Sequence, residues 1–260
     1  MSHSGKVVWV TGASSGLGRS LALGLAQQGD QVIATARDGE ALAELASEHE
    51  NIHPLSLDIT DTRALAEAPA RLQALAGHLD QAILNAGVCE YLDFPNPDWD
   101  AVRRVMEVNF FGTVGCVEIA LPMLRRSREA RPHLVMIGSQ VTAAPFPRAE
   151  AYGASKAALQ YFSDSLRIDL AVENIDVSVV NPGFVDTPLT RKNDFDMPFL
   201  MASDNAAALI LRKLRSRPRG FRFPFRLSLL LGLSSLLPGL WQKMMMPARQ
   251  YPSTDTGVDS

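Results

Sequence analysis

The sequence predicts an α/β fold in a single domain: a doubly wound parallel sheet with helices on both faces, forming a three-layer αβα sandwich. Two observations support this fold class. Short apolar runs rich in β-branched residues alternate with longer runs in which Ala and Leu recur at helical spacing. Nearly every residue of the short runs is apolar, as expected for parallel strands that are buried on both faces.

The expected elements alternate in order along the chain. We expect strands at residues 7–10, 31–35, 53–57, 81–84, 134–137 and 176–180, and helices at residues 17–28, 40–48, 62–76, 99–124 and 152–172. Each strand is bounded by turn residues or by a change from strand to helix period. No linker or composition break divides the first 220 residues, so a second domain is not expected.

The composition of the chain excludes several classes of function. The chain has 260 residues, 47% of them hydrophobic, and a net charge of −3, which offers no basic field for nucleic acid and favours a small-molecule substrate. Cys89 and Cys116 lack the C-x-x-C spacing of a redox or zinc site, so we expect reduced thiols and no metal site. The N-terminus shows no signal peptide pattern. These observations together favour a cytoplasmic protein.

The first expected strand runs into a glycine-rich turn, from Thr11 to Gly18. Gly12 can take the positive φ of a tight turn, Gly16 lets a pyrophosphate approach the backbone, and Gly18 permits close packing of helix on strand. The free N–H groups at the start of the next helix favour phosphate. This turn predicts a Rossmann-type dinucleotide-binding fold. A P-loop fits poorly, because no Gly-Lys-Ser/Thr closes the turn.

The same turn also matches G-x-S-x-G, which holds the nucleophile of α/β-hydrolases and would assign that role to Ser14. That alternative requires a later acid and then a later histidine on a loop. The last of the five histidines, His133, lies just before an expected strand, so the hydrolase hypothesis is disfavoured. The other four are His3, His49, His53 and His78.

A second group of polar residues begins the helix after the fifth strand. Tyr152 and Lys156 are four residues apart, so both point from one helix face, and Ser139 lies just past the end of the strand. A tyrosine is a poor acid-base catalyst at neutral pH unless a nearby cation lowers its pKa. The arrangement therefore predicts proton transfer by Tyr152, with Ser139 polarising a carbonyl.

These residues resemble, in order and spacing, the short-chain dehydrogenases/reductases of about 250 residues. The resemblance runs from residue 6 to about 190. The matching motifs are T-G-x-x-x-G-x-G at 11–18, Asn85-Ala86-Gly87, Asn109, Ser139, Tyr152-x-x-x-Lys156 and Pro182-Gly183.

The resemblance implies roles for the four catalytic positions. Tyr152 would be the general acid/base, and Ser139 would orient the substrate oxygen. Lys156 would lower the pKa of Tyr152 and bind the nicotinamide ribose, and Asn109 would hold a water that links Lys156 to solvent. The family's cofactor contacts correspond to Gly12, Ser14, Ser15, Gly16, Leu17, Gly18, Arg37, Asp58, Ile59, Asn85, Ala86, Gly87, Tyr152, Lys156, Pro182, Gly183, Val185 and Thr187.

The end of the second strand bears on the choice between NAD and NADP. An acidic residue there would bind the ribose 2′-OH and repel a 2′-phosphate. Ala36 stands at that position and Arg37, a forked cation suited to phosphate, follows it. We therefore expect NADP(H), with NAD(H) still open, because Ser15 stands where many NADP-dependent relatives have a second basic residue.

The C-terminal part is less familiar. Residues 221–226 resemble the seventh strand of the family, and the uncharged segment 227–241, too short to span a bilayer, contains Pro238. Two alternatives remain: a helix packed on the domain or on a partner subunit, and an interfacial helix in which Leu227, Leu230, Leu231, Leu237, Leu240 and Trp241 contact a membrane. The residues after Tyr251 are expected to fray.

These observations predict an NADP(H)-dependent carbonyl reductase acting on an apolar ketone or aldehyde, or on the matching alcohol. Residues 1–226 would form the catalytic domain, with a mobile lid at about 188–202, and residues 227–260 a C-terminal extension. The alternative is a non-catalytic NADP-binding redox sensor on the same fold. By resemblance, we expect a homodimer or homotetramer that packs through helices 99–124 and 152–172.

Overall fold

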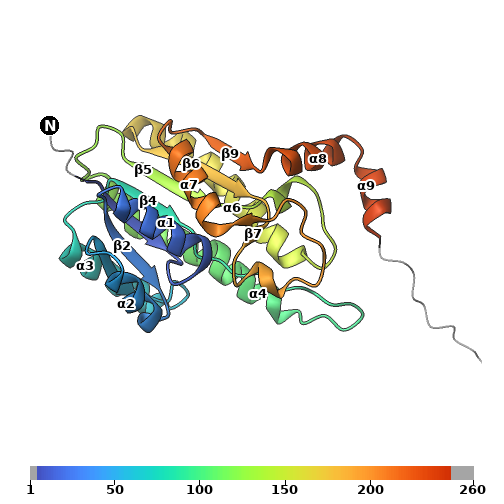
Figure 1. The fold of residues 1–260 in the computed structure, drawn as a ribbon, viewed down its shortest axis with the longest axis horizontal. Coiled ribbons are helices and arrows are strands. Elements are labelled where there is room, and N and C mark those ends of the chain that lie inside the picture. Colours follow the sequence, from blue (N-terminus) through green and yellow to red (C-terminus); the bar gives the residue numbers. More distant parts are fainter. Residues whose placement is uncertain (1–4, 247–260) are drawn as a thin grey trace, which may run out of the picture.

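The computed structural model describes residues 5–246, apart from the side chain of Ser235, and centres on one parallel sheet of seven strands (Figure 1). The strand order is β3-β2-β1-β4-β5-β6-β9, which reverses direction between β1 and β4. This order confirms the predicted fold class. The strands are β1 Val7–Thr11, β2 Gln31–Ala36, β3 Ile52–Ser56, β4 Gln81–Leu84, β5 His133–Ile137, β6 Asp176–Pro182 and β9 Gly220–Phe223.

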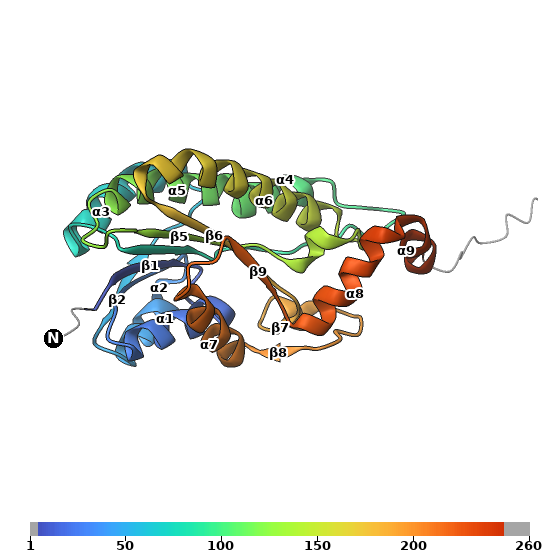
Figure 2. The ribbon, with the colours of Figure 1, turned by 90° about the horizontal axis from the view of Figure 1, so that it is seen from above.

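Two layers of helices cover the sheet, as Figure 2 shows. One layer consists of α1 Gly16–Gln27, α2 Gly39–Ser47 and α7 Ser203–Leu214, and the other of α3 Thr62–Leu75, α4 Asp100–Met106, α5 Thr113–Leu124 and α6 Glu150–Leu170. Alternate residues of β1 pack toward the two helix layers. Val8 and Val10 belong to the hydrophobic core beneath α1 and α7, and Val7 and Trp9 belong to the core beneath α3 and α5. Strand β1 is therefore buried and mainly apolar on both faces, as the sequence predicted.

The predicted helix 99–124 contains a π-helical turn, η1, at Glu107–Gly112, between α4 and α5. The helical segment Asp100–Leu124 is apolar and long enough to cross a membrane, but 44% of its most apolar stretch of 18 residues is buried inside the protein. It packs against the sheet as a core helix. Three short 3-10 helices, η2 Gln140–Ala143, η3 Ala171–Glu173 and η4 Thr190–Lys192, lie at the ends of longer elements or in loops.

Helix α7 was not predicted. Its apolar residues Ile210, Leu211 and Leu214 are buried against α1, where Gly24 leaves room for Leu211. The helix makes the crossover from β6 to β9, and it follows a short two-stranded sheet of β7 Val185–Asp186 and β8 Met201–Ala202.

The C-terminal segment forms two helices in place of the single one expected. Strand β9 ends at Phe223, before Pro224, and α8 Phe225–Leu236 is separated from α9 Pro238–Met245 by the proline. Leu227, Leu231 and Trp241 are buried in a small cluster with Ala144. The predicted frayed tail after Tyr251 lies outside the described residues.

Candidate active site

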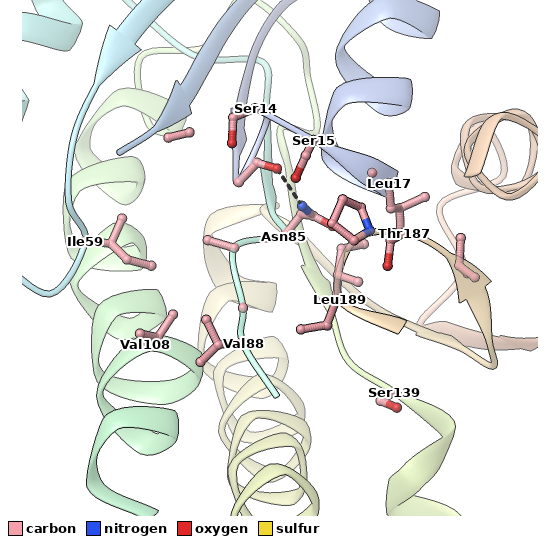
Figure 3. Close-up of a pocket in the computed structure, with 18 of the residues that line it drawn as sticks. Ser14, Ser15, Leu17, Ile59, Asn85, Val88, Val108, Ser139, Thr187 and Leu189 are labelled. Atoms are coloured by element: carbon pink, nitrogen blue, oxygen red, sulfur yellow. Dashed lines mark hydrogen bonds between the residues drawn. The ribbon is translucent and has the colours of Figure 1, made fainter. Parts of the chain in front are cut away.

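A cleft of about 800 Å³ lies at the carboxyl ends of the strands, where the sheet order reverses. Figure 3 shows the two ends of the cleft, with Ser14 and Ser15 at one end and Ser139 at the other. All the sequence-predicted site residues line this cleft except Gly18 and Asn109. Segments from the ends of six strands, β1 to β6, which are far apart in the sequence, thus meet at one edge of the sheet.

The glycine-rich turn at one end of the cleft depends on glycine geometry. Gly12 and Gly16 have φ of +68° and +52°, a region that side chains disfavour. A Cβ on Gly18 would lie 2.1 Å from the Gly12 carbonyl oxygen, so glycine lets α1 pack this closely on β1. Gly18 therefore shapes the turn from behind, which explains why it does not line the cleft.

The start of α1 has free donors. Within residues 5–246, no side chain caps α1, because Ser15 occupies the N-cap position without accepting a hydrogen bond. By contrast, Asp38 caps α2 and Asp61 caps α3. Unpaired N–H groups at a helix N-terminus that faces a cleft form an anion site.

Asn85 joins the turn to the end of β4. Its Nδ2 atom donates to the carbonyl oxygens of Thr11 and Gly12, each at 3.2 Å, and Figure 3 marks the second bond. The Thr11 hydroxyl accepts from the backbone N–H groups of Asn85 and Ala86. These hydrogen bonds thus connect the ends of β1 and β4 at the floor of the cleft.

Asn109 lies in the π-helical turn and holds the chain beside Lys156. Its Oδ1 accepts from the Val88 N–H at 2.8 Å, and its Nδ2 donates to the Val88 carbonyl and to the Ser155 hydroxyl, each at 2.9 Å. A Cβ on Gly87 would lie 3.2 Å from Asn109 Oδ1 and 3.4 Å from Lys156 Nζ. Asn109 is fully buried and contacts the cleft-lining segment through Val88 and Gly87.

Tyr152 and Lys156 both project from α6 into the far end of the cleft. Burial raises the pKa of Tyr152 to about 12, against the effect of a hydrogen bond from Ser139, and burial lowers the pKa of Lys156 to about 8. Lys156 Nζ lies 5.8 Å from the Tyr152 ring centroid. In this structure burial of the phenol outweighs the opposing effects, so the pKa of Tyr152 is raised, and the lowering of that pKa by Lys156 stays a prediction.

Ser139 is positioned by a residue that the sequence analysis missed. The Ser139 N–H donates to Asn181 Oδ1 at 2.9 Å, and Asn181 Nδ2 in turn donates to Gln160 on α6. Asn181 is buried at the end of β6, directly before Pro182-Gly183. A buried asparagine at a strand end, beside a motif already recognised, was the signal available in the sequence.

The geometry disfavours the hydrolase alternative. Ser14 does line the cleft, but none of the four histidines within the described residues does so. His133 is the first residue of β5 and is buried, with Nε2 2.8 Å from the Ser178 hydroxyl. A serine nucleophile needs an adjacent base, which these residues do not supply.

Arg37 stands at the cleft edge beside the end of β2. Its side chain is exposed and has no hydrogen-bond or ion-pair partner in the part of the chain that the structure describes. Asp38 also lines the cleft, but its carboxylate accepts from the Ala41 N–H at 3.0 Å as the cap of α2. The positive charge at this edge is therefore available to a ligand.

Segments from three loops are tied together beside the Tyr152 end; we call Tyr91, Arg148, Asn193 and Asp194 the lid clasp. The Tyr91 hydroxyl donates to Asn193 Oδ1 at 2.6 Å, and the Arg148 guanidinium stacks 5.0 Å from the Tyr91 ring centroid. Arg148 also pairs with Asp194 at 2.8 Å. The clasp holds the segment predicted as a lid against the loop after β4.

Comparison with known proteins agrees with this geometry. Residues 6–197 match the family model described as short chain dehydrogenase. An uncharacterized oxidoreductase of Myxococcus xanthus (strain DK1622) is 36% identical over 88% of this chain and 91% of its own length. A dehydrogenase/reductase SDR family protein 7-like of Drosophila melanogaster is 37% identical over 72% of this chain, and the match spans only 59% of that longer protein.

Among solved structures, a short chain dehydrogenase from Burkholderia cenocepacia J2315, determined in complex with NADP, superposes with a TM-score of 0.81. It is 27% identical, and the match covers 95% of this chain and all of that one. The motifs that line the cleft, the strand order and these matches have one explanation: the chain belongs to the short-chain dehydrogenase/reductase family of oxidoreductases.

Proposed function

We propose that this protein is an NADP(H)-dependent oxidoreductase that interconverts an apolar ketone or aldehyde and the corresponding alcohol. One observation carries the proposal: Tyr152, Lys156 and Ser139 line one end of a cleft whose other end has the glycine-rich turn and Arg37. A proton-transfer group thus shares a cavity with a site for a dinucleotide.

The residues present fit the cofactor. The uncapped start of α1 and the positive φ of Gly12 and Gly16 make a cradle for a pyrophosphate. The exposed, unpaired Arg37 suits a 2′-phosphate, and Ala36 offers no carboxylate to repel it. The related Burkholderia cenocepacia structure holds NADP, which supports the same assignment here.

The chain's own residues can then bind the substrate oxygen and supply the proton. NADPH, when bound, supplies the hydride. The Ser139 hydroxyl accepts from the Val141 N–H at 3.2 Å, and its one proton, which now bonds Tyr152, would turn to the substrate oxygen when substrate binds. Tyr152, whose pKa burial raises to about 12, is protonated at neutral pH and can donate the proton that completes reduction.

Lys156 would hold the nicotinamide ribose. Within residues 5–246 its ammonium donates one hydrogen bond, of 2.9 Å, to the Ile137 carbonyl, so two of its three donors remain for ribose hydroxyls. Asn109 acts behind it by fixing Val88 and Gly87, and a water on this side would complete the proton relay that the family resemblance implies.

Apolar side chains around the Tyr152 end favour an apolar substrate. Val88 and Leu189 line the cleft, and Phe195 of the predicted lid packs edge-on against both Tyr91 and Phe184, at centroid distances of 6.2 and 6.0 Å. We propose that residues 188–202 close over such a substrate.

We also propose a homodimer or homotetramer, packed through α4–α5 and α6. The outer faces of these helices present exposed Phe111, Tyr161 and Ile168, and large exposed apolar side chains on neighbouring helices suit subunit contact.

The proposal is tested by NADPH oxidation, with NADH in parallel, on a panel of aliphatic and aromatic ketones and aldehydes matched with short polar ones. We expect turnover with NADPH that rises with the apolar area of the substrate. Activity confined to the polar members would contradict the substrate class, and binding of neither nucleotide would contradict the cofactor assignment.

A further inference from the structure

The outer face of the C-terminal helix α8 is unusually apolar. The inner face buries Leu227 and Leu231, spaced four residues apart, against the domain. A helix on a protein surface ordinarily presents polar residues on the opposite face. Here the opposite face of α8 and the adjoining α9 present large apolar side chains, each more than half exposed: Phe225, Leu229, Leu233, Leu236, Leu240 and Met244.

The structure confirms that part of this segment packs on the domain, and the membrane contact stays a prediction. Leu227, Leu231 and Trp241 pack on the domain, and Trp241 Nε1 donates to the Pro145 carbonyl at 2.7 Å. Leu230, Leu237 and Leu240 remain exposed. The helix therefore has one face for the protein and a second apolar face that the described chain leaves uncovered.

The charges that the segment 205–246 carries have one sign. Arg222 and Arg226 lie exposed where α8 begins, and Lys243 lies exposed on α9. No Asp or Glu occurs between Asp204 and Asp255. Within the described residues, these three cations form no ion pair. A basic segment without acidic residues of its own complements a surface of negative charge and is poorly suited to meet the same segment of a second copy.

We propose that α8 and α9 dock this protein on an anionic lipid bilayer, with the outer leucine face in the acyl boundary and Arg222, Arg226 and Lys243 at the headgroups. Helix α8 has 12 residues and is about 18 Å long, too short to cross a hydrocarbon core of about 30 Å, so it lies along the interface. Figures 1 and 2 both show α8 and α9 projecting from one end of the molecule, where a flat surface can reach them.

The inner face of α8, opposite the proposed docking face, packs directly behind the cleft. The side chain of Leu227 packs so closely on Gly183 that a Cβ there would lie 2.5 Å from it, and Gly183 lines the cleft. The Gly183 N–H and Gln140 Nε2 both bind the Phe223 carbonyl, at 2.7 and 2.6 Å, which fixes the start of α8 to the site. Docking would thus place the cleft within about one helix diameter, some 10 Å, of the lipid.

Vesicle flotation of the full chain tests the proposal and does not depend on the proposed enzymatic activity. The vesicles are phosphatidylcholine alone, or an equimolar mixture of phosphatidylcholine and phosphatidylglycerol. We expect the protein to float with the anionic vesicles, less so in high salt, and weakly or not at all with the neutral ones.

Three variants locate the contact. Leu229→Gln with Leu233→Gln removes two leucines of the outer face, and we expect affinity to fall roughly 100-fold. Arg222→Gln with Arg226→Gln leaves the packing of α8 intact, and we expect it to lower the affinity for anionic vesicles roughly 30-fold. Leu75→Gln changes an exposed leucine on α3, in the far part of the fold, and should bind like wild type.

Failure of wild type to float with anionic vesicles would overturn the proposal, as would undiminished flotation of both double variants. Concentration-dependent self-association that the leucine substitutions abolish, without vesicle binding, would assign the face to a second copy instead. The arginine variant keeps the test decisive should the leucine variant fail to fold.

Discussion

The Lys156 ammonium donates a 2.9 Å hydrogen bond to the Ile137 carbonyl and so ties α6 to the end of β5. Both groups are buried, and the lysine is only 4% exposed. Burial disfavours the charged amine and lowers its pKa to about 8, while the neighbouring phenol of Tyr152 is held neutral. The two groups that the proposed reaction needs are therefore protonated together only below about pH 8.

This relationship predicts the pH dependence of reduction. With the free enzyme, kcat/KM should fall as pH rises through about 8, because Lys156 then loses its charge while Tyr152, with a pKa of about 12, keeps its proton. Steady-state rates across the alkaline range measure this fall in kcat/KM, the alkaline limb of the pH profile. In Lys156→Arg the cation persists and the limb near 8 should disappear, at a lower overall rate. A wild-type profile that is flat through 8 would contradict the assignment.

Arg37 should select the cofactor. In Arg37→Gln the KM for NADPH should rise roughly tenfold, since a charge-assisted hydrogen bond to the 2′-phosphate is lost at an exposed site. The KM for NADH should not change and serves as the internal control. Adding Ala36→Asp should reverse the preference toward NADH. Equal losses for both nucleotides in Arg37→Gln would point to a structural effect and away from phosphate recognition.

The lid clasp should govern substrate binding. Arg148→Ala removes the stacking on Tyr91 and the ion pair with Asp194, so the KM for the carbonyl substrate should rise roughly tenfold. The affinity for NADPH should stay the same, because Arg148 does not line the cleft. Arg125→Ala, which breaks an exposed pair with Glu173 elsewhere, is the matched control. If both variants behave alike, the clasp has no role in closure.

His133 should make the protein sensitive to mild acid. Burial lowers its pKa to about 3, and its Nε2–H donates to Ser178, whose own proton goes to the Pro218 carbonyl. As pH falls below about 6.5, the unfolded chain takes up a proton that the folded chain does not, so the free energy of unfolding decreases progressively toward pH 3. The loss should be roughly 2 kcal/mol by about pH 5.

Urea denaturation at a series of pH values measures that loss. His133→Gln should be less stable at neutral pH but should lose this part of the pH dependence, whereas His53→Gln, at a partly exposed position on β3, should retain it. The same slope in wild type and His133→Gln would assign the acid sensitivity to other groups.

The sequence predicted the sheet and most of the cleft because both depend on local patterns. Buried parallel strands are nearly continuous apolar runs, and the turn from Gly12 to Gly18 uses backbone geometry that few residues other than glycine can adopt. Helix α7 was missed because the segment before it was read as a lid, and the helix becomes evident only when Leu211 is seen to pack on Gly24 of α1.

Other features depend on contacts between distant segments. Asn181 supports Ser139 across 42 residues of sequence, and Tyr91 reaches Asn193 across 102. The pKa of Tyr152 likewise reflects burial by the whole cleft, while the sequence shows only the neighbouring lysine. Periodicity carries no information on such contacts.

The most direct test compares Tyr152→Phe with Tyr161→Phe, a highly exposed tyrosine on the same helix. NADPH binding, followed by fluorescence, should be unchanged in both variants. Turnover should fall roughly 100- to 10,000-fold in Tyr152→Phe alone, because only that change removes the proton donor. Full turnover in Tyr152→Phe would contradict the central claim, and tight NADPH binding by a wild-type protein that turns over no carbonyl would favour the non-catalytic redox sensor.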